Sequence, residues 1–374
     1  MILLFTKWGD SKADTWSGTP LGILSGLQKI HGEEKIKDVV ISQKRIQKVL
    51  CKVVRGIGKI FHINECEVTE HKIDDRIVKK LLMNCHEQPN IMFTEQLSEY
   101  IDNSYLFIDC SVDFAYRCQN SGELFSQYIP LKKTGKHSLI HIRKNRADAF
   151  YKKCRGIFTM GQWLVDDLVK NTKVEEKKVH CVGGGCNISI EKVDDSKKQG
   201  NRILFVGKDF ERKGGFLVLD AFKILNDKYP GKYQLYIAGP KEWPGKGHIP
   251  DGIHFLGLKT TEELEKYYNL CDIFVMPSYF EAYGIVFAEA LIYGLPCIGR
   301  DAFAMKEFIV EGENGYLIHE DSAEYLAKKM YDLLSDEKIR QGVIQKKEHY
   351  IEKYSWESVA KRITDVILND GYEV

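Results

Sequence analysis

The chain has 374 residues, of which 44% are hydrophobic and 29% charged, and its formal net charge is +1. This composition is that of a folded globular protein, which excludes a disordered chain, and so balanced a charge gives no reason to expect a nucleic-acid partner. The length exceeds one typical domain, so two domains are expected. No apolar run approaches the roughly eighteen residues of a membrane span, and the opening MILLF is too short for the apolar core of a signal peptide. We therefore expect a cytoplasmic protein that is at most peripherally bound to a membrane.

The first half of the chain alternates between strand and helix signals. Met1 to Thr6 reads as a strand, and Pro20 suits the first turn of a helix that runs to about Ile30. The polar stretch 191–201 is the best candidate for a linker to the second half. Further strands are expected near 37–41, 91–94, 105–109, 156–160 and 178–182, with helices around 72–85, 137–151 and 162–169.

A second alternation of the same kind begins at Arg202. Its strands are expected at 202–206, 233–238, 253–256, 272–276, 296–299 and 315–318, with helices between them. Strands that alternate with helices favour parallel sheets with right-handed crossovers. The sequence therefore predicts an α/β protein of two Rossmann-like, doubly wound domains, residues 1–190 and 191–354, with a cleft between them.

The most informative segment runs from Asp272 to Gly294. Residues 273–276 form an unbroken apolar run, as in a parallel strand that is covered on both faces by helices. Gly284 then opens a second apolar stretch, which is long enough for a helix and ends at Gly294. Ligands of open α/β sheets bind at the carboxyl ends of the strands, where helix N-termini present free N–H groups. We therefore expect a ligand at the loop between this strand and this helix.

Two glutamates belong to this segment: Glu281 in the loop, and Glu289 roughly one and a half turns into the helix. An ionised carboxylate only accepts hydrogen bonds, and its two oxygens can bind adjacent hydroxyl groups of a sugar or a ribose. The alternative is that Glu281 merely favours the positive end of the helix while Glu289 is a solvated helix residue. The apolar residues around Glu289 weigh against this alternative, because charged side chains prefer open faces.

Cations gather one strand-helix step earlier, in the segment VGKDFERKGG of residues 206–215. Lys208, Arg212 and Lys213 can donate charge-assisted hydrogen bonds to a diphosphate, and the two glycines that follow let it approach the backbone. A surface turn before a helix is the alternative. No Asp-x-Asp pair occurs in the sequence, so the common carboxylate clamp for a metal-bound diphosphate is missing.

With these motifs the chain, mainly residues 202–318, resembles the retaining glycosyltransferases of family 4, whose GT-B architecture has two facing Rossmann-like domains. The E-x7-E pair of that family matches Glu281 and Glu289, its Arg/Lys phosphate motif matches Arg212 and Lys213, and GLPCIG followed by EGENGYLI matches its usual tail. The resemblance implies that Glu281 contacts the donor sugar and Glu289 the ribose. It also implies that the last helix, residues 355–374, packs back onto the first domain, and that backbone N–H groups reach the sugar and phosphate from Tyr283, Gly284 and Ile285.

The chain departs from that family at three places. Lys208 stands where an arginine is frequent, which keeps the charge but loses the planar fork. The sequence AFA at 302–304 replaces a glycine pair, which puts the backbone contacts of that loop in question. A His-Asp pair is usual at one strand end of the first domain, and Asp109 with Cys110 stands there instead.

Two residues of the first domain are further candidates. Gly18 follows the first strand, where it can bring backbone N–H groups to a phosphate or an acceptor, although a simple turn glycine explains it nearly as well. Asp109 can stabilise positive charge near the anomeric carbon or orient the acceptor hydroxyl, and a strand-end cap is the alternative.

Together these features predict a glycosyltransferase of the hexosyltransferase class, which moves a sugar from a nucleoside diphosphate sugar to a glycan or lipid-linked glycan with retention of configuration. The cations replace a metal, so neither a metal nor another cofactor is expected, and the donor is UDP- or GDP-linked. The rivals are a sugar-nucleotide epimerase or hydrolase on the same fold and a nucleotide-sugar binding protein without turnover. The expected catalytic residues are Glu281, Arg212, Lys213 and Asp109, and the expected donor-binding residues are Gly18, Lys208, Tyr283, Gly284, Ile285, Glu289, Pro240 and Leu258, the last two near the base.

A cluster of basic residues in the first domain bears on where the acceptor is located. Because members of the resembling family often act on lipid-linked or surface glycans, this cluster predicts weak, salt-sensitive contact with an anionic membrane surface. A solvated helix face is the alternative, since no Trp, Phe or Leu face for insertion is evident there. The cluster comprises Lys132, Lys133, Lys136, His137, His141, Arg143, Lys144 and Arg146, followed by Lys152, Lys153 and Arg155.

Overall fold

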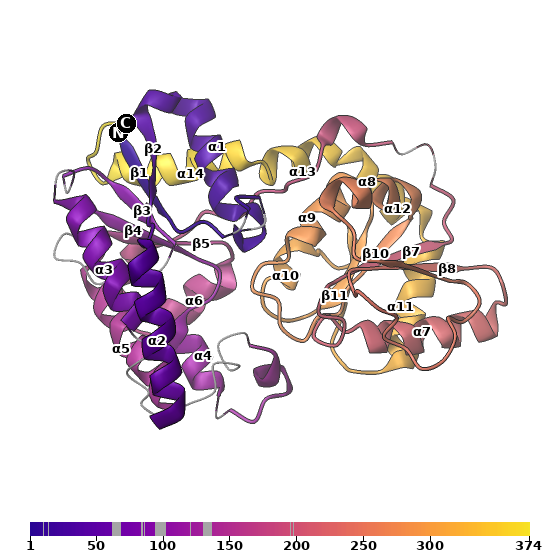
Figure 1. Ribbon diagram of the computed structural model, residues 1–374. Coiled ribbons are helices and arrows are strands. Elements are labelled where there is room, and N and C mark those ends of the chain that lie inside the picture. The colour runs from indigo at the N-terminus through magenta and orange to yellow at the C-terminus, as the bar shows by residue number, and fades with distance from the viewer. Residues whose placement is uncertain are drawn as a thin grey trace. The chain divides into compact units, whose positions relative to one another are not determined.

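The structure is a computed structural model that describes residues 1–374 except 10, 14, 62–68, 84, 86, 94–101, 120, 130–136, 195 and 197. For 55–61, 69–71, 124, 137–139 and 142 it describes the backbone alone. The chain forms two compact units (Figure 1): the first comprises Met1–Gly184 with Trp356–Val374, and the second comprises Gly185–Ser355. The sequence placed these boundaries after residues 190 and 354.

In the described part of the first unit, parallel strands form a sheet in the order β2-β1-β3-β4-β5-β6. The order changes direction between β1 and β3, which makes the carboxyl ends of these two strands the topological switch point of the sheet. The strands are β1 (Ile2–Thr6), β2 (Ile36–Val40), β3 (Asn90–Met92), β4 (Ser104–Ile108), β5 (Gly156–Thr159) and β6 (Val179–Cys181). The α-helices are α1 (Thr19–His31), α2 (Arg45–Phe61), α3 (Thr69–Leu82), α4 (Val112–Cys118), α5 (His137–Lys153), α6 (Gln162–Lys170) and α14 (Trp356–Asn369).

The last helix of the chain, α14, packs against the first helix, α1. Close approach requires glycine on α1, because a Cβ atom at Gly22 would collide with the ring of Trp356 and one at Gly26 with the Trp356 carbonyl. Two further contacts join these helices: Lys29 forms a salt bridge with Glu357, and His31 forms a hydrogen bond with Thr364. The carboxyl-terminal helix is thus part of the first unit.

The second unit contains a parallel sheet in the order β12-β11-β10-β7-β8-β9. Its switch point lies between β7 and β10, as in a dinucleotide-binding fold. The strands are β7 (Arg202–Val206), β8 (Gln234–Ala238), β9 (Ile253–Gly257), β10 (Ile273–Val275), β11 (Cys297–Arg300) and β12 (Gly315–Ile318). The α-helices are α7 (Gly215–Lys228), α8 (Thr261–Leu270), α9 (Ile285–Ile292), α10 (Met305–Phe308), α11 (Ala323–Ser335), α12 (Glu337–Gln345) and α13 (Lys347–Lys353).

Helices cover both faces of the second sheet. In Figure 1, α7 and α11 lie on one side of the strands and α8 and α9 on the other. The middle strand β10 is therefore completely buried, which explains why its sequence is an uninterrupted apolar run. No helix among the described residues is both long and apolar enough to cross a bilayer.

Two helices of the first unit, α2 and α4, were not expected from the sequence. Helix α4 has only 7 residues, and its start is fixed by the side chain of Ser111, which accepts a hydrogen bond from the amide of Phe114 at 3.0 Å. Helix α2 has 17 residues, but lysines interrupt its apolar residues at almost every turn. Its residues Ile46, Val49, Leu50 and Val53 are exposed, whereas the helices that are easy to recognise in a sequence bury their apolar face.

Candidate functional site

The switch point of the second sheet lies where β7 and β10 run side by side, and the loops after these strands carry the predicted site. In the first loop, Gly214 adopts a left-handed conformation with φ of 76°, and a Cβ atom there would lie 2.5 Å from the carbonyl oxygen of Pro277. Glycine avoids both the strain and the collision. The loop before α7 can therefore lie directly against the loop after β10.

Hydrogen bonds around Arg212 join these two loops. The amide of Tyr279 donates to the Arg212 carbonyl at 2.8 Å, and the hydroxyl of Ser278 donates to the same carbonyl at 3.1 Å. The Arg212 guanidinium in turn donates from Nη1 to the carbonyl of Phe280 at 2.7 Å. The segment that carries the cations is thus held beside the segment that carries Glu281.

Glu281 forms an ion pair with Lys213 across the two loops. Its Oε2 atom accepts a hydrogen bond from Nζ of Lys213 and lies 3.7 Å from Nη1 of Arg212. Glu281 is only 8% exposed, and burial lowers the pKa of the Lys213 ammonium although the nearby carboxylate acts in the opposite direction. Groups suited to sugar hydroxyls and groups suited to phosphate oxygens are therefore in direct contact here.

The N-terminus of α9 lies next to Glu281. Gly284 caps this helix in a left-handed conformation with φ of 90°, and a Cβ atom there would lie 2.9 Å from Cγ of Glu281. The first amides of a helix have no acceptor within it, so the N–H groups of Ile285 and Val286 face outward from the helix end. The ring of Tyr283 packs edge-on against Phe308 at 5.0 Å and belongs to the core. The helix end therefore adds backbone donors to the cations beside Glu281.

Glu289 is buried in the interior of the second unit. It is 4% exposed and accepts a hydrogen bond from the hydroxyl of Tyr268 at 2.9 Å, and the backbone of Asn187 also hydrogen-bonds to it. Burial raises the pKa of its carboxyl group to about 7, which the two hydrogen bonds reduce only in part. The interpretation of Glu289 as a solvated helix residue is therefore wrong. Glu289 accepts its hydrogen bond from the Tyr268 hydroxyl, whereas Glu281 accepts one from the Lys213 ammonium.

The other predicted donor-binding residues follow three neighbouring strands. Lys208 is exposed at the end of β7, beside Gly207. The ends of β7 and β8 touch, because a Cβ atom at Gly239 would collide with the Gly207 carbonyl group. Pro240 is buried directly after this contact, and Leu258, which follows β9, is 47% exposed. These residues share one edge of the sheet with the Lys213–Glu281 pair but belong to separate loops.

The loop with the sequence AFA at 302–304 keeps the backbone shape that glycine favours. Phe303 has a φ of 52°, a left-handed conformation that is uncommon for a residue with a side chain. Its ring packs edge-on against Phe280 at 5.0 Å, which holds it beside the Glu281 loop. The replacement of glycine has thus not prevented the turn.

Gly18 and Asp109 are brought together in the first unit by Trp16. Trp16 and Ser17 have φ values of 48° and 54°, and Gly18, with φ of 81°, continues the left-handed path and caps α1. The indole Nε1 of Trp16 donates to Oδ2 of Asp109 at 3.2 Å. The following helix is capped by Ser111, so Asp109 does not have that role.

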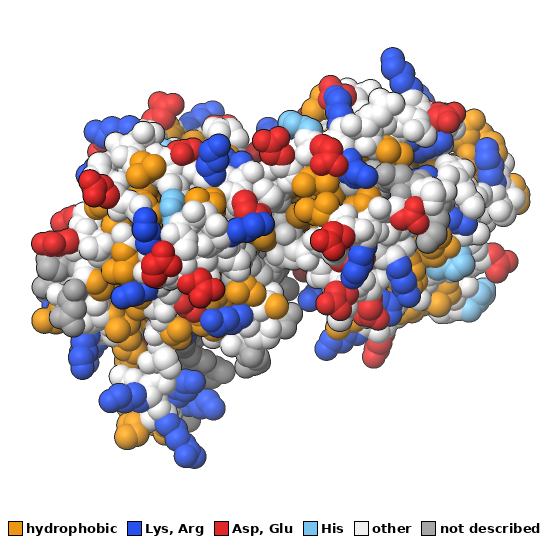
Figure 2. All heavy atoms as spheres, turned by 90° about the horizontal axis from the view of Figure 1, so that it is seen from above, with side chains coloured by type: hydrophobic (Ala, Val, Ile, Leu, Met, Phe, Trp, Pro, Cys, Tyr) orange, Lys and Arg blue, Asp and Glu red, His pale blue; other side chains and the backbone are white. Residues whose placement is uncertain are grey.

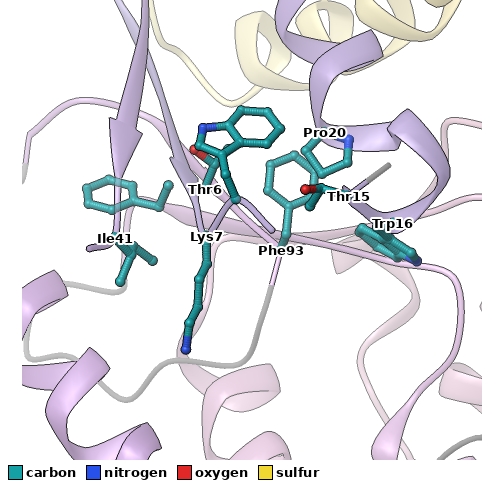
Figure 3. A pocket seen from close by; sticks show the side chains of 9 residues that line it. Thr6, Lys7, Thr15, Trp16, Pro20, Ile41 and Phe93 are labelled. Carbon is teal, nitrogen blue, oxygen red and sulfur yellow. The ribbon is translucent and has the colours of Figure 1, made fainter. Parts of the chain in front are cut away.

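A cavity of about 190 Å³ opens at the switch point of the first sheet (Figure 3). Its lining is mostly aromatic and aliphatic, and the sequence singled out Pro20 only as part of the first turn of a helix. The amino group of Lys7 is bound to Asp74 at 2.7 Å, and the indole of Trp8 is bound to Asp38 at 2.9 Å. The sequence signal for this cavity, which was not recognised, is the presence of aromatic residues soon after the strand ends. The lining residues are Phe5, Thr6, Lys7, Trp8, Thr15, Trp16, Pro20, Ile41 and Phe93.

The basic cluster of the first domain falls partly outside the described residues, which omit Lys132, Lys133 and Lys136. On α5, Nζ of Lys144 lies 3.1 Å from Asp113 and 2.5 Å from Asp148. Arg146 on the same helix pairs with Asp75 at 2.7 Å. These two cations therefore have carboxylate partners within the protein.

Comparison with known proteins bears mainly on the second unit. Residues 188–350 match the family described as glycosyl transferases group 1. Almost the whole of the second unit is thus similar to this family. Lys213, Glu281, Tyr268 and Glu289 all lie within the matched residues, so the Lys213–Glu281 and Tyr268–Glu289 contacts are internal to the matched region.

Several curated relatives of the chain carry glycosyltransferase names. The chain is 28% identical to an uncharacterized glycosyltransferase of Methanocaldococcus jannaschii, over 58% of this chain and 60% of that protein. It is 25% identical to a phosphatidyl-myo-inositol mannosyltransferase of Mycolicibacterium smegmatis, over 46% of each. The chain thus spans about half the length of the curated relatives it matches.

Solved structures extend the likeness from the matched region to the whole fold. WaaG, a glycosyltransferase involved in lipopolysaccharide biosynthesis, aligns with a TM-score of 0.66 and 15% identity over 98% of this chain and 99% of its own. The Anabaena protein HepE, solved in complex with UDP and glucose, aligns with a TM-score of 0.61 and 12% identity over 98% and 99%. The predicted GT-B fold is confirmed.

Proposed function

We propose that the protein is a retaining glycosyltransferase that moves a sugar from a UDP- or GDP-linked donor to a glycan or lipid-linked glycan without a metal. The observation that supports this most is the contact of Lys213 and Arg212 with Glu281 at the switch point of the second sheet, within the region that matches the glycosyl transferases group 1 family. A nucleoside diphosphate sugar requires cations for its phosphates and a hydrogen-bond acceptor for its sugar hydroxyls. This site holds both in direct contact.

Transfer breaks the bond between the anomeric carbon and the leaving phosphate oxygen, where negative charge develops. Lys213, Arg212 and the outward-facing amides of α9 stabilise this charge, which is the main catalytic contribution expected of the protein. The new bond to the acceptor oxygen forms on the same face of the sugar, and the acceptor proton passes to the leaving phosphate. Configuration is then retained, and no side chain acts as a covalent nucleophile.

The remaining residues position the substrates. Glu281 accepts hydrogen bonds from the donor sugar when the diphosphate takes over part of the Lys213 charge. Glu289 binds the ribose, while Lys208 contacts the phosphates and Pro240 with Leu258 borders the base. In the first unit, Gly18 lies at the N-terminus of α1, and Asp109, held by Trp16, orients the acceptor hydroxyl.

Replacing Lys213 by alanine is expected to weaken binding of the free nucleoside diphosphate by roughly 1.5 to 3 kcal/mol, the usual contribution of a hydrogen bond to a charged group. Isothermal titration of the wild-type and variant proteins measures this difference. Lys223→Ala is the matched control, because Lys223 lies on α7 of the same unit but pairs with Asp227 at the surface. Unchanged affinity in Lys213→Ala would exclude Lys213 from the phosphate site.

Sugar transfer is expected to continue in the presence of EDTA, since Lys213 and Arg212 supply the positive charge that a metal would otherwise provide. The measurement compares initial rates with and without the chelator. Loss of activity that Mg²⁺ or Mn²⁺ restores would contradict the proposal of a metal-independent reaction.

Two simple experiments separate the rival functions. Thermal denaturation with UDP, GDP, ADP or dTDP identifies the base. A ligand that binds the folded state raises its stability, and the increase grows with the ratio of the ligand concentration to its dissociation constant. Each sugar derivative of that nucleotide is then incubated with and without acceptor extracts, and nucleotide release is measured. Release that requires acceptor supports a transferase. Equal release without acceptor indicates a hydrolase, and binding without release indicates a binding protein.

A further inference from the structure

Helix α2 of the first unit exposes an aliphatic stripe. Ile46 is 82% exposed, Val49 54%, Leu50 49% and Val53 52%. These positions are three, four and seven residues apart, so they lie on one side of the helix. Isolated exposed aliphatic residues are ordinary, but a contiguous stripe along a helix indicates an interaction site.

The rest of the surface of α2, outside the aliphatic stripe, divides into two sectors with different roles. Successive residues of a helix are rotated by about 100°, which places Gln47, Cys51 and Val54 together on another side. Cys51 is only 6% exposed and its thiol donates to the side chain of Gln43, so this side faces the protein. The aliphatic stripe is therefore not the face by which α2 joins the fold.

Cations occupy the remaining sector of the helix. Lys44, Arg45, Lys48 and Lys52 are exposed, and none forms an ion pair with another described residue. The sequence continues with Arg55 and Lys59, and no Asp or Glu occurs between Asp38 and Glu65. Figure 2 shows Lys and Arg side chains gathered with hydrophobic ones on a projecting edge of the first unit. This contrasts with Lys144 and Arg146 of α5, whose charges are used in internal ion pairs.

We propose that α2 is a docking helix for an anionic lipid bilayer surface. Its aliphatic stripe enters the boundary between headgroups and acyl chains, and its cations contact anionic headgroups, while the helix lies parallel to the surface. The charge argues for this partner, because a long cationic sector without a single acidic residue complements a uniformly anionic surface. The proposal concerns a different segment from the basic cluster of residues 132–155, and it does not depend on the proposed reaction.

Cosedimentation of the full chain with vesicles tests the proposal. Vesicles of phosphatidylcholine with phosphatidylserine are expected to bind the protein, and vesicles of phosphatidylcholine alone are expected to bind it much more weakly. Ile46→Ser with Leu50→Ser is expected to lower binding by roughly tenfold or more, and Lys48→Glu with Lys52→Glu is expected to lower it further at low salt. Matched controls on α14 of the same unit, Leu368→Ser and Lys361→Glu, change an exposed residue of each kind and should bind as the wild type does.

Insertion is distinguished from electrostatic adsorption by fluorescence. Ile46→Trp is expected to be quenched by brominated acyl chains, whereas a helix that only adsorbs would leave the indole unquenched and overturn the proposal. Binding that survives the α2 variants but is lost when Lys132 and Lys133 are neutralised would also overturn it. So would a concentration-dependent dimer that Ile46→Ser with Leu50→Ser abolishes while vesicles fail to bind. An unchanged circular dichroism spectrum and an unchanged thermal unfolding transition show that each variant remains folded.

Discussion

Glu281→Ala is expected to lower the turnover number by roughly 100-fold or more while the affinity for the free nucleoside diphosphate stays equal or rises. The first effect follows because Glu281 is proposed to contact the sugar as its bond to the phosphate breaks. The second follows because Glu281 now neutralises Lys213 and lies 3.7 Å from Arg212. Removing this carboxylate leaves both cations free to attract a diphosphate.

Two measurements check this prediction: steady-state kinetics of transfer, and calorimetric titration with UDP or GDP. Glu337→Ala is a suitable control, since Glu337 is an exposed glutamate at the start of α12 in the same unit. If Glu281→Ala lowered turnover and nucleotide affinity by the same factor, Glu281 would contribute equally to binding of the ground state and of the transition state. The proposed role in transition-state stabilisation would then be wrong.

Glu289→Gln is expected to stabilise the protein at pH 8 and to weaken nucleotide binding. Burial raises the pKa of Glu289 from 4.5 to about 7, so between these values the folded state binds more protons than the unfolded chain. A rise in pH through this window therefore lowers the free energy of unfolding. A neutral glutamine avoids this loss, which amounts to at most about 3 kcal/mol for a shift of this size.

Urea unfolding of both proteins at pH 5 and pH 8 measures the difference. The stability gain of Glu289→Gln over the wild type should be small at pH 5 and larger at pH 8, and Glu324→Gln, at an exposed position, should show no such change. A gain that does not vary with pH would mean that Glu289 does not titrate as described. A gain with unaltered UDP or GDP affinity would remove Glu289 from the ribose site.

The strands of the second unit could be predicted because each one is buried between helices. A strand such as β10 has no solvent-facing side, so its sequence is apolar throughout and ends abruptly at Pro277. Gly284 likewise marks the start of α9 by a conformation that side chains disfavour. In such places local sequence and global fold require the same residues, and the GT-B fold follows from their order.

The contacts within the site could be predicted only in part. Lys213 and Glu281 were both expected near the ligand, but their direct pairing depends on how closely Gly214 lets two loops approach, 68 residues apart. The Tyr268 hydroxyl that binds Glu289 belongs to another helix and gives no local signal. Similarly, the link from Trp16 to Asp109 arises from three consecutive left-handed residues, two of which are not glycine.

The exposed stripe of α2 was missed for the opposite reason. Sequence patterns are usually interpreted by assuming that apolar residues are buried. Ile46 and Leu50 have helical spacing, yet they face away from the core, and only their exposure in the structure reveals a surface feature. The basic cluster of residues 132–155 was predicted to contact a membrane surface, but two of its cations, Lys144 and Arg146, have carboxylate partners within the protein.

The most direct test of the proposed reaction is proton NMR of the transferred sugar, with EDTA present and with the donor and acceptor found by the nucleotide-release experiment. The coupling constant of the anomeric proton gives the configuration of the sugar in the donor and in the product. A retaining enzyme that uses Lys213 and Arg212 in place of a metal is expected to place the sugar on the acceptor with the configuration that it had in the donor. An inverted product, or sugar that appears only as free hexose, would contradict the proposal.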